Sequence, residues 1–244
     1  MLELSLIAPC LNEQENVRIL AERFLSAAES HSLQVEVVFV DDGSTDFTWE
    51  RLEELQQEHP GKIELVRHSS NRGIPQGWIS GVEASAGRLV CLIDSDLQNP
   101  PESVFDLYSA FQNDAPDFVR GVRCPVRQQP RARVLMSRTL NIVLNFVFGM
   151  ASADNKSGFL LGRREAMLDI VRHKGHYTHF QTFIGVAAHS KGYRTIEIDT
   201  PFEDRRNGIS FLSGNSLRVV RQVFGDIPEA QWEYGSKFRL WRRT

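Results

Sequence analysis

The sequence predicts an α/β fold in which a mostly parallel central sheet carries helices on both faces. Short apolar segments alternate with segments of helical periodicity through the first half of the 244 residues, and this alternation is typical of parallel sheets. Polar motifs directly follow three of the apolar segments, at the sheet edge where such folds bind ligands. The hydrophobic content of 41% and the charged content of 24% are those of an ordinary globular protein.

Four strands and four helices are predicted to alternate between residues 4 and 117. The strands are expected at 4–9, 35–40, 63–66 and 89–93, and the helices at 15–30, from 44 or 45 to 57, at 74–86 and from Pro101 onward. Residues 35–40 are almost all β-branched or aromatic, which predicts a buried strand. Ser44 or Thr45 is expected to cap the second helix, and Gly87 is expected to cap the end of the third.

Polar residues gather after the first, second and fourth strands. These clusters are Asn12-Glu13, Asp41-Asp42 and Asp94-Ser95-Asp96. Any one of them also fits ordinary turn chemistry, but three on one sheet edge predict a binding site. Asp94 and Asp96 with the side-chain oxygen of Gln98 form a hard oxygen set that suits Mg²⁺ or Mn²⁺.

Charge divides the chain into two unlike halves. Residues 1–117 carry 7 Lys and Arg against 21 Asp and Glu, a net charge of -14, whereas the whole chain carries only -3. Residues 118–153 contain no acid and six arginines, and they lead into an amphipathic helix expected at about 131–150. A basic stretch before such a helix is typical of the membrane interface, but packing in the core or in a dimer interface fits the helix equally well. A basic, aromatic tail follows at 237–243.

The cysteines and the apolar segments indicate the compartment. Cys10, Cys91 and Cys124 are odd in number and far apart, which favours a reduced, cytoplasmic protein without a structural zinc site. No signal peptide is apparent at the start of the chain. Residues 134–151 are too polar to span a bilayer. We therefore expect a cytoplasmic protein on the cytoplasmic face of the membrane.

The motifs resemble those of family 2 glycosyltransferases with the GT-A fold, specifically the dolichyl-phosphate mannose synthase-like branch. The residues that carry the resemblance run in order along the chain: Ala8-Pro9-Cys10-Leu11-Asn12-Glu13, Val40-Asp41-Asp42-Gly43-Ser44-Thr45-Asp46, Asn71-Arg72-Gly73, Asp94-Ser95-Asp96-Leu97-Gln98-Asn99-Pro100-Pro101, Asp154 with Ser157-Gly158-Phe159, and Asp204-Arg205-Arg206-Asn207-Gly208-Ile209-Ser210. The resemblance implies a nucleotide-diphospho-sugar transferase-like fold with one catalytic domain over 1–210. Within it, 1–117 would be the nucleotide-sugar and metal half and 118–210 the acceptor half, followed by a C-terminal helix and basic tail over 211–244.

The resemblance also implies a role for each matching residue. Nucleotide binding falls to Pro9, Asn12, Glu13, Asp41, Asp42, Arg72, Gly73, Asp94 and Ser95, with either Asp41 or Asp42 accepting a hydrogen bond from the base or ribose. Divalent metal binding falls to Asp94, Asp96 and Gln98, and catalysis to Asp96 and Arg205. Acceptor-phosphate binding falls to Arg123, Arg138, Ser157, Arg205 and Ser210.

The implied activity is metal-dependent, inverting transfer of a sugar from a nucleotide-diphosphate sugar to a polyprenyl phosphate at the membrane surface. A hydroxyl acceptor on a glycan or lipid is the alternative, with His176 or His179 as a candidate base, and a non-catalytic nucleotide-sugar-binding protein is a third. Leu160 follows Phe159 where the branch often has Arg, and Phe211 follows Ser210 where it often has Lys. Residues 9–13 contain no glycine, which disfavours nucleotidyltransferases and dinucleotide dehydrogenases. We expect no nucleic-acid partner; a homodimer or a membrane-anchored partner remains open.

Overall fold

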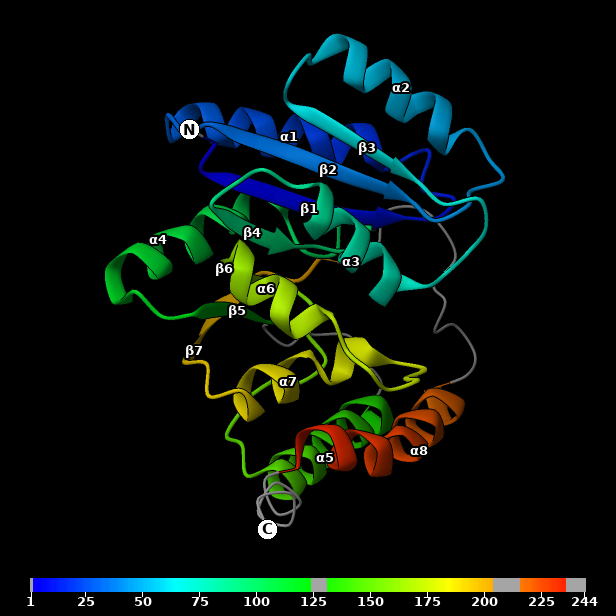
Figure 1. Ribbon diagram of the computed structural model, residues 1–244, viewed down its shortest axis with the longest axis vertical. Coiled ribbons are helices and arrows are strands. Elements are labelled where there is room, and N and C mark those ends of the chain that lie inside the picture. The colour runs from blue at the N-terminus through cyan, green and yellow to red at the C-terminus, as the bar shows by residue number, and fades with distance from the viewer. Residues whose placement is uncertain (1, 124–130, 204–215, 236–244) are drawn as a thin grey trace.

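One twisted sheet runs through the molecule with its strands in the order β3-β2-β1-β4-β6-β5-β7 (Figure 1). This computed structural model describes residues 2–123, 131–203 and 216–235. Its strands are β1 (Leu4–Cys10), β2 (Val35–Asp41), β3 (Ile63–Arg67), β4 (Leu89–Leu92), β5 (Phe118–Arg123), β6 (Leu160–Arg163) and β7 (Thr195–Thr200). Among these strands only β6 runs antiparallel to its neighbours. The predicted α/β class with a mostly parallel sheet is confirmed.

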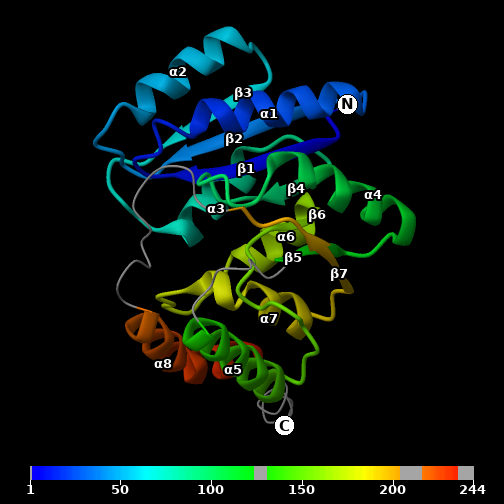
Figure 2. The ribbon, with the colours of Figure 1, turned by 180° about the vertical axis from the view of Figure 1, so that it is seen from behind.

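Helices cover both faces of this sheet, as the alternating pattern predicts (Figure 2). They are α1 (Val17–Ser30), α2 (Thr48–Glu58), α3 (Ile74–Ala84), α4 (Val104–Asp114), α5 (Arg131–Phe148), α6 (Arg164–Val171), α7 (Ile184–Ser190) and α8 (Ser216–Tyr234), with short 3₁₀ turns η1 (Pro101–Ser103) and η2 (Phe180–Thr182). Successive side chains of a strand point to opposite faces. Leu6 and Ala8 therefore pack with α1, α2 and α4, while Ile7 between them packs with α3, α6 and α7.

Strands from both halves of the sequence belong to the same sheet. β1–β4 come from residues before 118, and β5–β7 come from residues after it. The pairing of β4 with β6 joins the two groups, with Leu89 opposite Arg163 and Leu92 opposite Leu160. The acidic and basic halves of the chain thus contribute strands to one continuous sheet.

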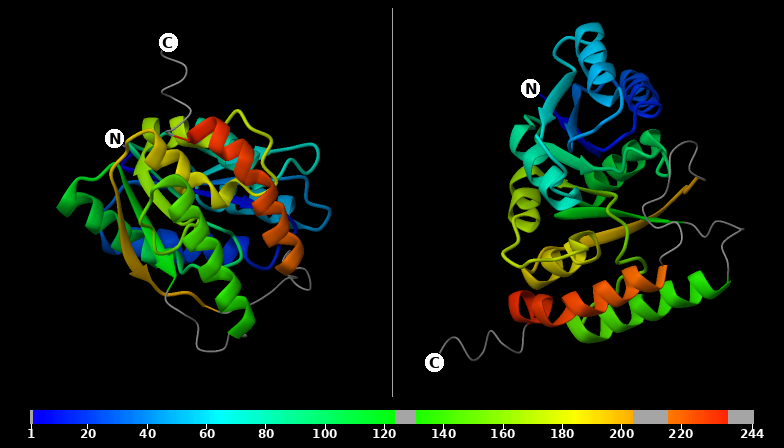
Figure 3. Two further views of the ribbon diagram at one scale, coloured as in Figure 1. Left: turned by 90° about the horizontal axis from the view of Figure 1, so that it is seen from below. Right: turned by 90° about the vertical axis from the view of Figure 1, so that its right-hand side faces the viewer.

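The helices α5 and α8 lie side by side as an outer layer beyond α7 (Figure 3). Leu140 and Leu144 of α5 and Val223 and Ala230 of α8 are buried in the core cluster that includes α6 and α7. The amphipathic helix predicted at about 131–150 therefore exists as α5, with one face buried. Within residues 2–123, 131–203 and 216–235, no helix has the length and hydropathy needed to cross a bilayer.

Two predicted helix caps are wrong. Helix α2 begins at Thr48, and Asp46 Oδ1 accepts hydrogen bonds from the Thr48 backbone N–H and hydroxyl, so neither Ser44 nor Thr45 caps it. Helix α3 ends at Ala84, before Gly87. A Cβ at position 87 would lie 2.5 Å from Ser5 Oγ, so this glycine permits close approach of the chain to β1.

Candidate active site

The predicted polar clusters meet at the carboxyl edge of the sheet. Cys10 at the end of β1 is in register with Asp41 at the end of β2. On the other side of β1, the Ile93 backbone N–H donates to the Ile7 carbonyl just after β4 ends. The Ser95 hydroxyl then donates to the Pro9 carbonyl at 2.8 Å. These contacts bring the motifs after β1, β2 and β4 into one site.

Asn12 and Glu13 hold the chain that leads into α2. Asn12 Oδ1 accepts a hydrogen bond from the Thr45 backbone N–H at 2.8 Å, and the Asn12 backbone N–H donates to Ser44 Oγ at 2.9 Å. The Glu13 backbone N–H donates to Thr48 Oγ1 at 2.9 Å. Asn12 has a φ of 57°, a left-handed conformation in which asparagine is enriched among side-chain-bearing residues. The residue thus links the first two motifs through its side chain and its backbone.

Asp42 holds the loop that begins α3. Its Oδ1 accepts from the Arg72 backbone N–H at 2.9 Å and lies 2.7 Å from His68 Nδ1, while its Oδ2 accepts from the Gly73 backbone N–H at 2.8 Å. The Asp42 side chain is only 7% exposed. Both carboxylate oxygens are therefore engaged in positioning the Arg72-Gly73 segment.

Asp41 differs from its neighbour because one of its oxygens receives no hydrogen bond in the described structure. Its Oδ1 accepts from the Ser44 backbone N–H at 3.0 Å, but Oδ2 is buried without a hydrogen-bond partner and lies 3.4 Å from Arg67 Nε. Arg67 is half exposed and its guanidinium lies over the Trp49 ring, 4.6 Å from the centroid. A buried acceptor without a donor is costly, so this atom is suited to a donor supplied by a ligand once Arg67 moves aside.

The Asp94-Ser95-Asp96-Leu97-Gln98 segment turns sharply after β4. Leu97 has a φ of 61° although it is fully buried, and such strain in a bulky residue is typical of functional segments. Asp96 Oδ1 accepts from the Gln98 backbone N–H at 3.1 Å. The Gln98 carbonyl accepts a hydrogen bond from the backbone N–H of Glu203, which follows β7, at 2.8 Å. The segment is thereby held between β4 and the chain that leaves β7.

The donor set of this segment fits a divalent cation. Asp94 and Asp96 supply carboxylates and Gln98 can supply an amide oxygen, all from one turn. Asp94 and Gln98 are partly exposed and Asp96 is 8% exposed. Among the described residues, no group of three or more His, Cys, Asp or Glu side chains forms a metal site. Mg²⁺ in proteins commonly uses one or two carboxylates and completes its shell with substrate phosphates and water.

The predicted acceptor residues lie in different surroundings. Arg123 Nε and Nη2 donate to the two carboxylate oxygens of Asp154 at 2.7 and 2.9 Å. Burial opposes ionisation of Asp154, but the hydrogen bonds and charge of Arg123, together with Lys156, outweigh it and lower the pKa of that carboxyl. The buried Ser157 hydroxyl donates to the Gly121 carbonyl at 2.6 Å. Arg138 is exposed on α5, and the predicted Arg205 and Ser210 lie outside the described residues.

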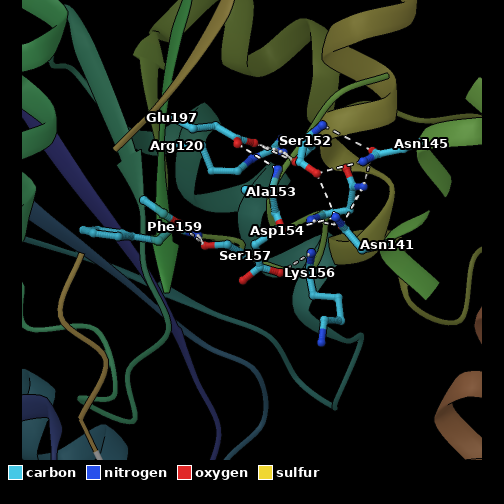
Figure 4. A network of polar contacts seen from close by, with 12 residues as sticks. Arg120, Asn141, Asn145, Ser152, Ala153, Asp154, Lys156, Ser157, Phe159 and Glu197 are labelled. Atoms are coloured by element: carbon cyan, nitrogen blue, oxygen red, sulfur yellow. Dashed lines mark hydrogen bonds and ion pairs between the residues drawn. The ribbon is translucent and has the colours of Figure 1, made fainter. Parts of the chain in front are cut away.

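A buried polar network fixes α5 and the 152–157 segment to the sheet (Figure 4). Arg120 of β5 is 2% exposed, and its Nη1 donates to Ser152 Oγ at 3.0 Å. The Ser152 hydroxyl donates to Glu197 Oε1 at 2.6 Å. Asn141 and Asn145 of α5 both donate to the Ser152 carbonyl. The network fixes the chain immediately before Asp154, which pairs with Arg123.

Gln181 joins this site although no sequence pattern singled it out. Its Nε2 donates to Asp94 Oδ2 at 3.4 Å. A Cβ at Gly158 would lie 2.7 Å from the same nitrogen, so Gln181 also adjoins the Ser157-Gly158 segment. His179 Nε2 lies 3.1 Å from Gln222 Oε1 of α8, and His176 is exposed. The hydrogen bond to Asp94 thus comes from Gln181, while His179 contacts α8.

Comparison with known sequences gives a family match over most of the chain. A family model described as glycosyl transferase family 2 matches residues 5–171. An undecaprenyl-phosphate 4-deoxy-4-formamido-L-arabinose transferase of Pectobacterium carotovorum is 32% identical over 222 residues, which are 90% of this chain and 65% of the relative. A polyprenol monophosphomannose synthase of Mycolicibacterium smegmatis is 29% identical and is matched over 87% of this chain and 82% of its own length. This chain thus spans about two thirds of the length of the first relative.

Solved structures share the fold at lower sequence identity. Glucosyl-3-phosphoglycerate synthase from Mycobacterium tuberculosis has a TM-score of 0.69 and 18% identity, with 93% of this chain and 79% of that chain covered. A mannosyltransferase from Pyrobaculum calidifontis in complex with GDP-Man and Mn²⁺ has a TM-score of 0.65 and 16% identity, with coverages of 93% and 64%. At these identities the likeness establishes the GT-A fold predicted from the sequence.

Proposed function

Because this chain belongs to glycosyltransferase family 2, we propose that it transfers a sugar from a nucleotide-diphosphate sugar to a polyprenyl phosphate. The observation that carries the proposal is the meeting of the Pro9, Asp41 and Asp94 motifs at one sheet edge. Two relatives are named for undecaprenyl phosphate and for polyprenol, and these names support a polyprenyl phosphate as the acceptor. Residues 1–117 would form the donor half of one domain, and 118–210 the acceptor half.

Asp41 rather than Asp42 is the better candidate to bind the nucleoside. Both Asp42 oxygens hold the Arg72-Gly73 segment and His68. Asp41 Oδ2 instead lies buried beside Arg67 without a hydrogen bond. An N–H of the base or an O–H of the ribose would satisfy this oxygen. In this proposal Asn12, Glu13, Arg72 and Gly73 shape the pocket, because their contacts hold its walls.

Asp94, Asp96 and Gln98 would hold Mg²⁺ or Mn²⁺ on the diphosphate of the donor. The departure of a nucleoside diphosphate builds negative charge, which a bound divalent cation offsets. A structure of glucosyl-3-phosphoglycerate synthase with Mn²⁺ and UDP, and that of the mannosyltransferase with GDP-Man and Mn²⁺, support this role. Asp96 is the residue we assign first, because its Oδ1 also holds the backbone of Gln98 in place.

The acceptor phosphate would approach from the side of β5 and α5. Arg123 pairs with Asp154 through Nε and Nη2, so Nη1 lies outside the pair and is available in this proposal to an anion. Arginine suits phosphate because its planar group donates several hydrogen bonds at once. Arg138 lies exposed on the next helix. We keep Arg205 and Ser210 as further phosphate ligands on the strength of their motif alone.

Peripheral contact with a membrane would involve the outer face of α5 and α8. Leu135 and Ile142 are 67% exposed and Phe146 is 89% exposed, and their spacing of seven and four residues places them on one face of α5. Trp232 of the neighbouring α8 is 66% exposed. Arg138 lies on the same side of α5 as the apolar residues. Such a face suits the boundary between lipid headgroups and acyl chains.

The decisive experiment supplies labelled UDP- or GDP-sugars with Mn²⁺ and offers either undecaprenyl phosphate or a lipid-free glycan. The proposal predicts label in the lipid fraction only. Label on the glycan alone would assign the activity to the hydroxyl-acceptor class. Nucleotide binding without any transfer would assign the chain to non-catalytic binding proteins.

A further inference from the structure

Three carboxylates of α8 bind the backbone of one loop. Asp226, Glu229 and Glu233 are three and four residues apart, so they lie on one face of the helix. They accept hydrogen bonds from five backbone N–H groups between residues 174 and 179, at 2.8–3.2 Å. Glu233 also accepts from the Tyr177 hydroxyl at 2.8 Å. We name residues 173–179 the α8-bound loop.

The α8-bound loop leads directly into η2 and Gln181. Phe180 and Phe183 of this turn are fully buried, and the Phe183 backbone N–H donates to the Phe180 carbonyl at 2.7 Å. Gln181 therefore has little freedom to leave its position beside Asp94. A helix at the outer layer of the molecule thus fixes a side chain that contacts the proposed metal-binding segment.

We propose that Gln181 orients the acceptor and selects acceptors that already carry a negative charge. The α8 carboxylates position Gln181 for this role. This inference rests on the proposed function. Gln181 Nε2 lies between Asp94 Oδ2 and Gly158, which are in the donor-side and acceptor-side segments respectively. An amide N–H there donates to an anionic oxygen near the reacting carbon.

The chemistry of the transfer explains the selection. A phosphate oxygen attacks the anomeric carbon of the sugar, the bond from that carbon to the diphosphate oxygen breaks, and its electron pair leaves with the nucleoside diphosphate. No proton moves, because the attacking oxygen is already an anion. A hydroxyl acceptor must instead lose its proton to a base in the transition state. The amide of Gln181 accepts no proton at neutral pH, so it serves the first reaction and not the second.

Gln181→Glu and Gln181→Ala test the proposal. Gln57→Glu is the matched control, because Gln57 is exposed on α2. We expect Gln181→Ala to lower kcat/KM for undecaprenyl phosphate by about 10-fold, the loss typical of one hydrogen bond to a charged group. Gln181→Glu should raise the KM for this acceptor further, since it places a like charge beside the phosphate. Thermal stabilisation by Mn²⁺ and the nucleotide should persist in Gln181→Ala and in the control.

Glu233→Ala and Glu233→Gln test the role of α8. Glu233→Ala should accelerate hydrogen exchange at the Lys174 and Gly175 amides and raise the acceptor KM, while nucleotide binding persists; Glu233→Gln should recover part of both effects. An unchanged kcat/KM for undecaprenyl phosphate in both Gln181→Ala and Gln181→Glu would overturn the inference while leaving the proposed function intact. A wild-type protein that glycosylates only hydroxyl acceptors would overturn both.

Discussion

Asp96 is the residue on which metal-dependent turnover should depend most. Its carboxylate lies in the turn that follows the buried strand β4, and its Oδ1 accepts a hydrogen bond from the Gln98 backbone N–H. Asp96→Asn keeps an acceptor oxygen for that hydrogen bond but removes the charge that a divalent cation requires. We expect sugar transfer to fall by on the order of 100-fold, the size of effect found when one preorganised electrostatic contact is removed from a transition state.

The measurement is the rate of transfer at saturating Mn²⁺, with the thermal midpoint of the free protein as the control for folding. An unchanged midpoint with lost transfer supports the metal role. Transfer at the wild-type rate would show that the metal-binding assignment is wrong.

The ion pair of Arg120 and Glu197 should contribute to stability rather than to catalysis. Arg120 is 2% exposed, and burial lowers its pKa, against the opposing effect of Glu197. Their closest atoms are 3.6 Å apart, and Ser152 bridges them. We expect Glu197→Ala to lower the free energy of unfolding by about 3 kcal/mol, because it leaves a buried charge unpaired.

Urea denaturation would measure that loss. Asp199→Ala, at an exposed position two residues along the same strand, serves as the control and should change stability by less than about 0.5 kcal/mol. A Glu197→Ala variant as stable as this control would mean that Arg120 is satisfied without its carboxylate.

At the scale of the element, sequence patterns predict the four strands before residue 94 well and the helix caps poorly, and they leave β5, β6 and β7 unpredicted. Residues 35–40 are so strongly β-branched that β2 was placed to within one residue. Gly87 was expected to end α3, but its role is the close approach to Ser5, which depends on a partner 82 residues away in the chain. The same limit applies to Gln181, whose contact with Asp94 joins residues that are 87 positions apart. Local patterns do not encode such pairings.

The C-terminal helix shows this limit most clearly. The carboxylates at 226, 229 and 233 look in the sequence like an ordinary solvated helix face. In the structure they bind five backbone N–H groups of the α8-bound loop, and only the fold reveals that loop as their partner. Their helical spacing was the available signal, but it did not name what they bind.

The exposed face of α5 should bind anionic bilayers. We expect the double variant Ile142→Glu, Phe146→Glu to lose most of its cosedimentation with vesicles that contain phosphatidylglycerol. The variant removes apolar surface that would insert into the bilayer, and it adds negative charge that the anionic lipid repels. Phe47→Glu is the matched control. Phe47 is 68% exposed and directly precedes α2. Helix α2 lies at the opposite end of the molecule from α5 and α8 (Figure 1).

Equal binding by the double variant and the control would exclude this face from membrane contact. A concentration-dependent shift of the wild-type protein to a dimer, abolished by the same double variant, would instead identify the face as an interface between copies. Both assays run without donor or acceptor, so their outcome is independent of catalysis.

At the scale of the whole molecule, the uneven charge acquires a structural meaning. The surplus acid of residues 1–117 includes Asp41, Asp42 and the Asp94-Ser95-Asp96 turn at the edge of β1, β2 and β4. The acid-free stretch 118–153 supplies β5 and α5 on the other side of the same sheet. An anionic nucleotide sugar bound at an acidic edge requires a cation, whereas an anionic phosphate acceptor bound at a basic edge does not. Metal dependence should therefore belong to donor binding.

Nucleotide binding to the free protein tests that division. A ligand present at 100 times its Kd stabilises the native state by about 2.7 kcal/mol, which raises Tm by roughly 5–10 °C for a chain of this size. We expect a shift of this size with Mn²⁺ and one of the two nucleotides, UDP or GDP, and a much smaller shift when EDTA replaces Mn²⁺. Asp96→Asn should lose the Mn²⁺-dependent part, whereas the acceptor-side Gln181→Ala should keep it. A full shift in EDTA would place the donor's affinity in the pocket around Asp41 alone, and the acidic edge would then hold the nucleotide without a metal.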